Sequence, residues 1–184
     1  GPYEAALSRL AVAPDGCVLE LGFGPGEGIA RLVDLAPAGR IAGIDASAEM
    51  VRVAAKRNAA AFRTGQAGLV RSEFASLPFS AGSFDRVLAV NVVYFWERPE
   101  VIVREIVRVL KPGGRLVAFA TDRRSMDKWS FAGTDTHRHF DTGSLAALFE
   151  RGAADFSSVR VDEIRLAGGV RGLCAVADRP VAAL

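Results

Sequence analysis

Four glycines at every second position are the residues of this sequence whose spacing points most directly to chemistry. They stand in the stretch VLELGFGPGEG at 18–28, between an apolar run and a segment with helical spacing. Glycines this close together allow a sharp turn from strand to helix and let a ligand touch the main chain. The helix behind them offers unpaired backbone N–H groups. The pattern therefore predicts a loop that binds a nucleotide-like ligand, with Glu20 near the end of the preceding strand.

The spacing of these glycines separates two classes of nucleotide ligand. A dinucleotide-binding loop requires the pattern G-x-G-x-x-G. Counted from Gly22 the third glycine falls on Glu27, and counted from Gly24 it falls on Ile29, so neither register fits. An NAD-type oxidoreductase is therefore disfavoured. A glycine-rich turn without a ligand is disfavoured as well, because strand, acid, glycines and helix coincide.

Strand-like and helix-like segments alternate along the chain, and this order predicts the fold class. The expected strands are 17–21, 40–44, 68–73, 86–90, 116–120, 159–166 and 170–177. Alternation of strands with helices indicates a parallel sheet that has helices on both faces. The link 167–169 is short enough for an antiparallel hairpin. We therefore expect an α/β, Rossmann-like, doubly wound sheet of seven mostly parallel strands, with a C-terminal antiparallel hairpin.

Length and composition are those of one domain covering residues 1–184. Half of the 184 residues are hydrophobic and the formal net charge is only +2. No long basic run suggests a nucleic-acid partner, and no apolar run is long enough to span a membrane. No signal peptide opens the chain, so a cytoplasmic protein is expected. Gly1-Pro2 has the character of a residual cloning pair, which suggests that native residues upstream of it are missing.

Polar residues recur at the carboxyl ends of the predicted strands, where an open parallel sheet binds its ligands. They are Glu20, Asp45, Glu73 and Asn91. Asp45 lies about 20 residues beyond the first glycine, where an acid can accept hydrogen bonds from the hydroxyls of a ribose. The alternative for Asp45 is that it only caps the helix that begins after Ser47.

Taken in order, several segments resemble the class I S-adenosylmethionine-dependent methyltransferases. The spacing E-x-G-x-G-x-G, from Glu20 to Gly26, resembles the first motif of that family. The other matching segments are GIDAS at 43–47, SEFASLPF at 72–79, FDRVLAV at 84–90 and REIVRVLKPGG at 104–114. Together they are most similar to the small-molecule branch of the ubiquinone/menaquinone-biosynthesis type (methyltransferase type 11). The resemblance implies S-adenosylmethionine as the cofactor, S-adenosylhomocysteine as the product and a small molecule as the acceptor.

The resemblance also implies which residues surround the cofactor. They are Glu20, Gly22, Phe23, Gly24, Gly26, Asp45, Ala46, Met50, Glu73, Phe74 and Asn91. The glycine loop, Glu20 and Asn91 would lie at the methionine part, and Asp45 would take the ribose hydroxyls. Ala46 and Met50 would pack near the adenine. Glu73 would meet the adenine amino group, although the family often has Gly-Asp-Ala at 72–74, and a solvated surface glutamate is its alternative.

The acceptor side of the predicted site carries aromatic and polar residues without a clean pattern. The candidates are Tyr94, Trp96, Trp129, His137 and His139. The last three fall in the segment 121–140, which we expect to be a long loop with a short helix. Packing in the core is an equal alternative for Tyr94 and Trp96. For the histidines a plain loop is favoured over a general base, and we expect no metal site because no further ligand set accompanies them.

Two further features bear on the reaction. At 91–94 the chain has Asn-Val-Val-Tyr where nucleic-acid amino methyltransferases carry Asn-Pro-Pro-Tyr, and no target-recognition domain follows. Methylation of a nucleic acid is therefore disfavoured. The sulfonium methyl group is already activated, so its transfer by in-line displacement needs mainly alignment, and no catalytic residue is assigned. A domain that binds the cofactor without catalysis is the alternative, and the sequence indicates neither the acceptor nor an oligomeric state.

Overall fold

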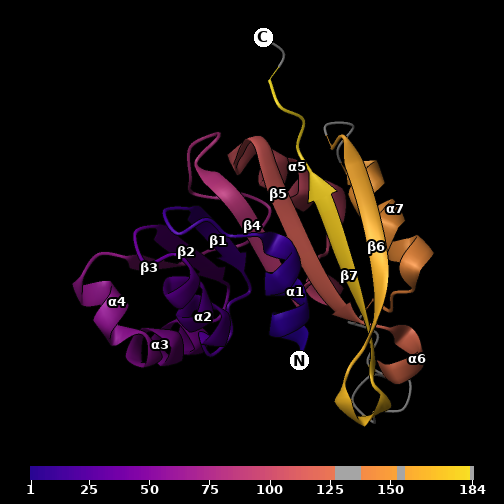
Figure 1. Cartoon of the computed structure of the whole chain (residues 1–184), viewed down its shortest axis with the longest axis horizontal. Helices are drawn as coiled ribbons and strands as arrows, with labels where there is room; N and C mark the ends of the chain where they lie inside the picture. The colour runs from indigo at the N-terminus through magenta and orange to yellow at the C-terminus, as the bar shows by residue number, and fades with distance from the viewer. Residues whose placement is uncertain (127–137, 153–155, 183–184) are drawn as a thin grey trace.

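A seven-stranded sheet forms the centre of the chain in the computed structural model, which describes residues 1–126, 138–152 and 156–182 (Figure 1). The strand order is β3-β2-β1-β4-β5-β7-β6. The first five strands in the chain pair in parallel, whereas β7 is antiparallel to both β5 and β6. The predicted fold class and its C-terminal antiparallel hairpin are therefore confirmed.

The strands follow the apolar runs of the sequence closely. They are β1 (Cys17–Leu21), β2 (Arg40–Asp45), β3 (Ala67–Arg71), β4 (Phe84–Val90), β5 (Leu110–Thr121), β6 (Ser158–Arg165) and β7 (Arg171–Asp178). Most strand boundaries differ from the prediction by a residue or two, and the differences in β3 and β5 have structural consequences. β3 ends at Arg71, so Glu73 lies beyond the strand. β5 begins at Leu110 instead of Leu116, because Leu110 pairs with Phe84 before a register shift.

Helices cover both faces of the sheet, as predicted. They are α1 (Pro2–Leu10), α2 (Glu27–Leu35), α3 (Ala48–Arg57), α4 (Ala59–Arg63), α5 (Pro99–Val109), α6 (Arg123–Met126) and α7 (Thr142–Gly152), with 3-10 turns η1 (Val93–Phe95) and η2 (Ala167–Gly169). Side chains of a strand alternate between its faces, so Val18 belongs to the core cluster that includes α1 and α2, while Leu19 belongs to the cluster that includes α5 and α7. None of the described helices is long and apolar enough to cross a membrane.

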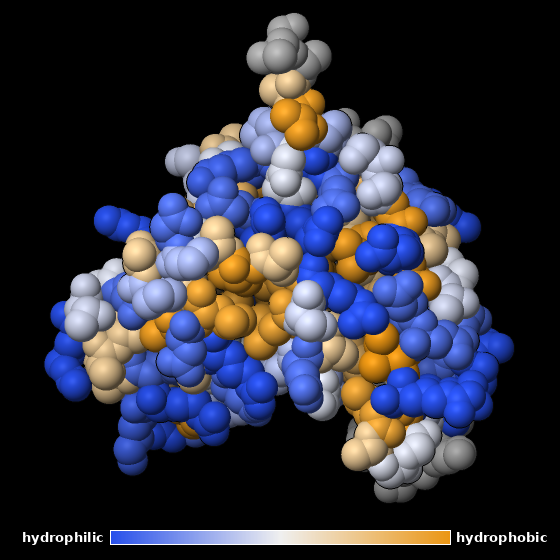
Figure 2. Space-filling model, in the orientation of Figure 1, coloured by the Kyte–Doolittle hydropathy of each residue, from blue (hydrophilic) through white to orange (hydrophobic). Residues whose placement is uncertain are grey.

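Helix α1 lies across the middle of one face, over β4, β5 and β7 (Figure 1). Arg86 donates a hydrogen bond to the carbonyl of Leu10 (2.8 Å), at the C-terminal end of the helix. Arg9 forms an ion pair with Asp162 on β6 (3.2 Å). Apolar residues gather near the centre of this face and hydrophilic residues cover its rim (Figure 2). The helix is thus fixed at its far end, while its first turn lies at the carboxyl ends of the strands.

The register of the central strands places their carboxyl ends at one level. Leu21 lies opposite Ile44 of β2 and Ala89 of β4. Asp45, the last residue of β2, and Asn91, the first residue after β4, therefore lie at the same edge of the sheet, as ligand-binding residues do in open parallel sheets.

Candidate functional site

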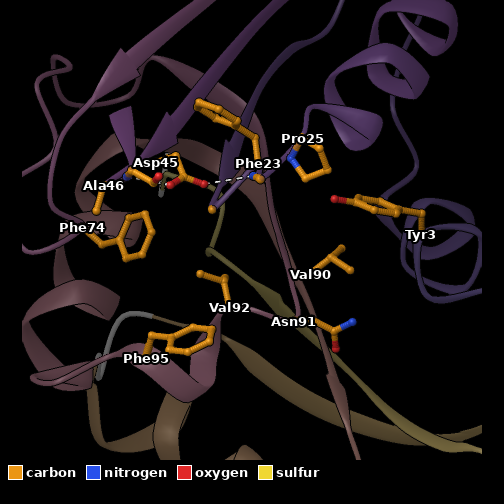
Figure 3. Close-up of a pocket in the computed structure, with 13 residues that line it drawn as sticks. Tyr3, Phe23, Pro25, Asp45, Ala46, Phe74, Val90, Asn91, Val92 and Phe95 are labelled. Atoms are coloured by element: carbon orange, nitrogen blue, oxygen red, sulfur yellow. Dashed lines mark hydrogen bonds between the residues drawn. The ribbon is translucent and has the colours of Figure 1, made fainter. Parts of the chain in front are cut away.

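A cavity of about 470 Å³ opens at the carboxyl ends of β1, β2 and β4 (Figure 3). The predicted residues that line it are Gly22, Phe23, Gly24, Asp45, Ala46, Phe74 and Asn91. The residues that sequence reasoning missed are Tyr3, Pro25, Ser47, Val90, Val92 and Phe95. The cavity therefore combines the start of α1 with the loops that follow four strands.

Gly22 and Gly24 of the glycine loop both line this cavity, but the space beside the two residues differs. Gly22, Gly24 and Gly26 all have positive φ angles, of 68°, 50° and 82°. A Cβ atom at Gly22 would lie 2.4 Å from Val92, and one at Gly26 would lie 2.7 Å from Ala54 of α3. A Cβ atom at Gly24 would meet nothing within 4 Å. Packing within the protein thus accounts for two of these glycines, and Gly24 is the one that borders open space.

Asp45 ties the glycine loop to the start of α3. Its Oδ2 accepts a hydrogen bond from the backbone N–H of Gly24 (2.9 Å), and its Oδ1 accepts one from the N–H of Ser47 (2.9 Å). The hydroxyl of Ser47 in turn caps the helix by accepting from the N–H of Met50 (3.3 Å). A carboxylate oxygen can accept more than one hydrogen bond. Asp45 therefore contributes to the cap and still offers acceptors to the cavity.

Glu20 lies behind the loop and is fully buried. Its Oε1 accepts a hydrogen bond from the hydroxyl of Tyr3 (3.0 Å), whereas its Oε2 has no hydrogen-bond partner. The pKa of Glu20 is raised to about 8, chiefly by burial and also by the carboxylates of Asp45 and Glu27, while the hydrogen bond from Tyr3 acts to lower it. Burial and the proximity of Glu20 also raise the pKa of Tyr3. Tyr3 lines the cavity and Glu20 does not. Glu20, which was predicted to surround the cofactor, is therefore linked to the cavity through the hydroxyl of Tyr3.

Asn91 ends β4 with a positive φ angle of 54°, a conformation that asparagine tolerates better than most residues. Its Oδ1 accepts hydrogen bonds from the hydroxyls of Tyr94 (3.0 Å) and Thr121 (3.4 Å). The Tyr94 hydroxyl also accepts a hydrogen bond from the backbone N–H of Thr121. Burial raises the pKa of Tyr94. These contacts hold Asn91 at the cavity between the ends of β4 and β5.

The aromatic residues after Asn91 divide between core and cavity. Tyr94 and Trp96 are buried and do not line the cavity. Both side chains therefore pack in the core, which was the alternative to a place in the acceptor pocket. Trp96 packs against Phe149 of α7, with ring centroids 6.1 Å apart. Phe95 lies between them in η1, is 54% exposed and points to the cavity instead (Figure 3). The 3-10 turn explains the difference, because it directs successive side chains to different sides.

The remaining candidates on the acceptor side are less informative. His139 is exposed and does not belong to the cavity lining. Trp129 and His137 lie outside the described residues.

A second cavity of about 440 Å³ continues from the first and shares Ala46, Phe74 and Phe95 with it. Glu73 lines this second cavity, although β3 ends before it. Met50 is half-buried, packs against the cluster around α2 and α3, and borders neither cavity. Gly26 likewise contacts α3 and not the cavity.

Comparison with known proteins adds the decisive observation. A family described as "Methyltransferase domain" matches residues 19–118, which include the glycine loop, Asp45 and Asn91. The chain belongs to this family. It is an S-adenosylmethionine-dependent methyltransferase of class I, so the predicted family, enzyme class and cofactor are confirmed.

The relatives of this methyltransferase differ in how much of their length it spans. The uncharacterized methyltransferase YdaC of Bacillus subtilis is 25% identical over 95% of this chain and 89% of its own length. The ubiquinone/menaquinone biosynthesis C-methyltransferase UbiE of Geotalea daltonii is 32% identical over 64% of this chain, which spans only 52% of that relative. The [4+2]-cyclase SpnF has the same fold, with a TM-score of 0.80 over 98% of this chain and 81% of its own, at 18% identity. A shared fold does not by itself fix the reaction.

Proposed function

We propose that this domain transfers the methyl group of S-adenosylmethionine to a small-molecule acceptor by in-line displacement. The observation that carries the proposal is the cavity at the carboxyl ends of β1, β2 and β4. There Gly24 leaves the main chain accessible and Asp45 keeps acceptor capacity free. The relatives include a C-methyltransferase of ubiquinone/menaquinone biosynthesis, which fits an acceptor of small-molecule size.

The residues around the cavity suit the parts of the cofactor. The two connected cavities, of about 470 and 440 Å³, have the size of small-molecule sites. Asp45 would accept hydrogen bonds from the ribose hydroxyls. Ala46 and Phe74 offer apolar surface for the adenine, and Glu73 in the second cavity would accept from its amino group. The main chain at Gly24 would lie along the methionine part.

Other residues predicted to surround the cofactor would position the glycine loop by packing inside the protein. Gly22 and Gly26 let the loop approach Val92 and α3, and Met50 packs against the core cluster that includes Phe23 of the loop. Phe23 anchors the loop in the core with a fully buried side chain. These contacts would hold the loop in one conformation, so that the ligand meets a preformed surface.

When bound, the cofactor supplies a methyl group on a positively charged sulfur. The chain's own contribution is alignment, which accounts for most of the rate in a transfer of this kind. Asn91 is held by Tyr94 and Thr121, and Asp45 is held by two backbone N–H groups. These fixed positions would keep acceptor and donor in line without a dedicated catalytic base.

Calorimetric titration of the domain with S-adenosylmethionine, S-adenosylhomocysteine and NAD tests the cofactor site. We expect one-site binding of the first two ligands and no binding of NAD. Binding of NAD alone would contradict the proposal.

An assay for S-adenosylhomocysteine release, with pooled metabolites or with an oligonucleotide pool, tests the acceptor class. We expect release with metabolites and none with oligonucleotides. Binding of the cofactor without release in either pool would favour the non-catalytic alternative.

A further inference from the structure

Tyr3, at the start of α1, is a polar group of the cavity that neither the motifs nor the family assignment identifies. We propose that its hydroxyl oxygen accepts a hydrogen bond from the ammonium group of the cofactor's methionine part, with the Glu20 carboxylate behind it as the compensating charge. The inference rests on the proposed function, because it takes S-adenosylmethionine as the ligand of this cavity.

The direction of the hydrogen bond between these residues is the first argument. The Tyr3 hydroxyl donates to Glu20 Oε1 at 3.0 Å. Its proton is engaged there, and the backbone N–H of Gly28 acts as a donor toward the same oxygen. The second lone pair of the tyrosine oxygen remains for a donor from the cavity. An ammonium group has donors and no acceptor. The arrangement therefore suits a cation on the cavity side of Tyr3.

The charge behind Tyr3 is the second argument. Glu20 is fully buried and its Oε2 has no partner, which is rare for a buried carboxyl group and calls for an explanation. A Cβ atom at Gly28 would lie 2.0 Å from Oε1, so the first turn of α2 closes that side of the carboxyl. Asp45 and Glu27 are the other charged groups acting on Glu20, and both are acidic. The surroundings of Glu20 are thus electrostatically complementary to a cation.

The position of the Tyr3 ring is the third argument. Arg31 lies 5.9 Å from the ring centroid, but its own ion pair with Glu27 (2.7 Å) occupies it. A further cavity of about 260 Å³ shares Tyr3, Val90 and Asn91 with the main cavity. Tyr3 therefore borders two open spaces while part of its side chain packs against the core cluster that includes α1 and α2. In Figure 3 it lies on the side of Asn91, across the cavity from Asp45 and Phe74, which is the side proposed for the methionine part.

Titration of three variants with two ligands tests this role. The variants are Tyr3→Phe, Glu20→Gln and the double substitution. The ligands are S-adenosylhomocysteine and 5′-methylthioadenosine, which keeps the adenosine and sulfur but lacks both the ammonium and the carboxylate of the amino-acid part. We expect each single substitution to weaken S-adenosylhomocysteine binding by about tenfold, the loss of one charge-assisted hydrogen bond. The double variant should lose little more, because the two groups act in series, and binding of 5′-methylthioadenosine should not change.

Arg9→Ala provides a control for the packing of α1. It removes the ion pair with Asp162 at the far end of the helix and leaves Tyr3 intact. We expect a lower melting temperature with unchanged affinity for S-adenosylhomocysteine. Wild-type affinity in Tyr3→Phe, an equal loss for both ligands, or the same loss in Arg9→Ala would each overturn the role of Tyr3. If the wild-type domain binds neither ligand, the proposed function itself fails.

Discussion

At the residue scale, the burial of Glu20 makes the stability of the domain depend on pH. Its carboxyl group is fully buried, with one hydrogen bond from Tyr3 and an Oε2 atom that has no partner. Burial disfavours the charged form and raises the pKa from 4.5 to about 8. At a pH between these two values, Glu20 therefore keeps its proton in the folded domain and releases it in the unfolded chain. In the site we propose, a cation in the cavity would favour the charged form of Glu20 and so lower this pKa.

We predict that Glu20→Gln becomes more stable relative to the wild type as pH rises. An acid whose pKa is higher in the folded state stabilises the fold fully below its unfolded pKa, here 4.5. That contribution is lost as pH rises toward the folded pKa of about 8. Glutamine stays neutral, so the difference in unfolding free energy should shift in its favour by roughly 1.4 kcal/mol per pH unit. Urea unfolding at pH 5.5, 6.5 and 7.5 measures this shift, and a difference that is independent of pH would refute the buried, protonated state.

Residue-scale prediction from sequence worked where the signal was local. Asp45 and Asn91 follow apolar strands directly, and both line the cavity. Tyr3 could not be found in this way, because its partner Glu20 lies 17 positions away on another element. Its place in an amphipathic helix gives no hint that its hydroxyl faces a cavity.

At the element scale, the glycine loop shows how packing and ligand access share one motif. Gly22 approaches Val92 and Gly26 approaches α3, so a side chain at either would collide with the protein. Only Gly24 of the three has free space beside it. In this motif Gly22 and Gly26 allow close packing within the protein, whereas Gly24 leaves space for a ligand.

Substitution by alanine should separate these purposes. Gly22→Ala combines a positive φ of 68° with a contact of 2.4 Å to Val92, so we expect a loss of roughly 2–4 kcal/mol in unfolding free energy. Gly24→Ala meets no atom and should lose only about 1–2 kcal/mol. Its added methyl group should nevertheless weaken S-adenosylhomocysteine binding by about tenfold, because the main chain of Gly24 borders the cavity.

Gly65→Ala is the matched control for this comparison. Gly65 has a φ of 73° with open space around it, and it does not line the cavity. It should show the same small loss of stability as Gly24→Ala with unchanged affinity. Urea unfolding and calorimetry measure both quantities, and wild-type affinity in Gly24→Ala would contradict the role given to the loop.

The 3-10 turn η1 shows where element prediction from sequence stops. The apolar run after Asn91 does not reveal which of its aromatic side chains faces outward. The turn buries Tyr94 and Trp96 and exposes Phe95. The third strand shows a similar limit, since the edge strand β3 ends before Glu73 and shifts that acid into the second cavity.

At the scale of the whole molecule, the fold follows from the sequence more completely than the site does. Alternating strands and helices, with a short link before the last strand, were sufficient to predict the seven-stranded sheet and its hairpin. The strand-end walls of the cavity were predicted with it. The wall formed by α1 depends on contacts between distant segments, such as Arg86 with Leu10 and Arg9 with Asp162. No local pattern in the sequence encodes that docking.

A crystal structure of the domain grown with S-adenosylhomocysteine tests the central claim most directly. The account predicts the ligand in the cavity at the carboxyl ends of β1, β2 and β4. Its ribose hydroxyls should lie within hydrogen-bond distance of Asp45, its adenine beside Phe74, and its ammonium group on the hydroxyl of Tyr3. Density for the ligand in another part of the molecule, or in this cavity with the adenine at Tyr3 and the ammonium group at Phe74, would contradict it.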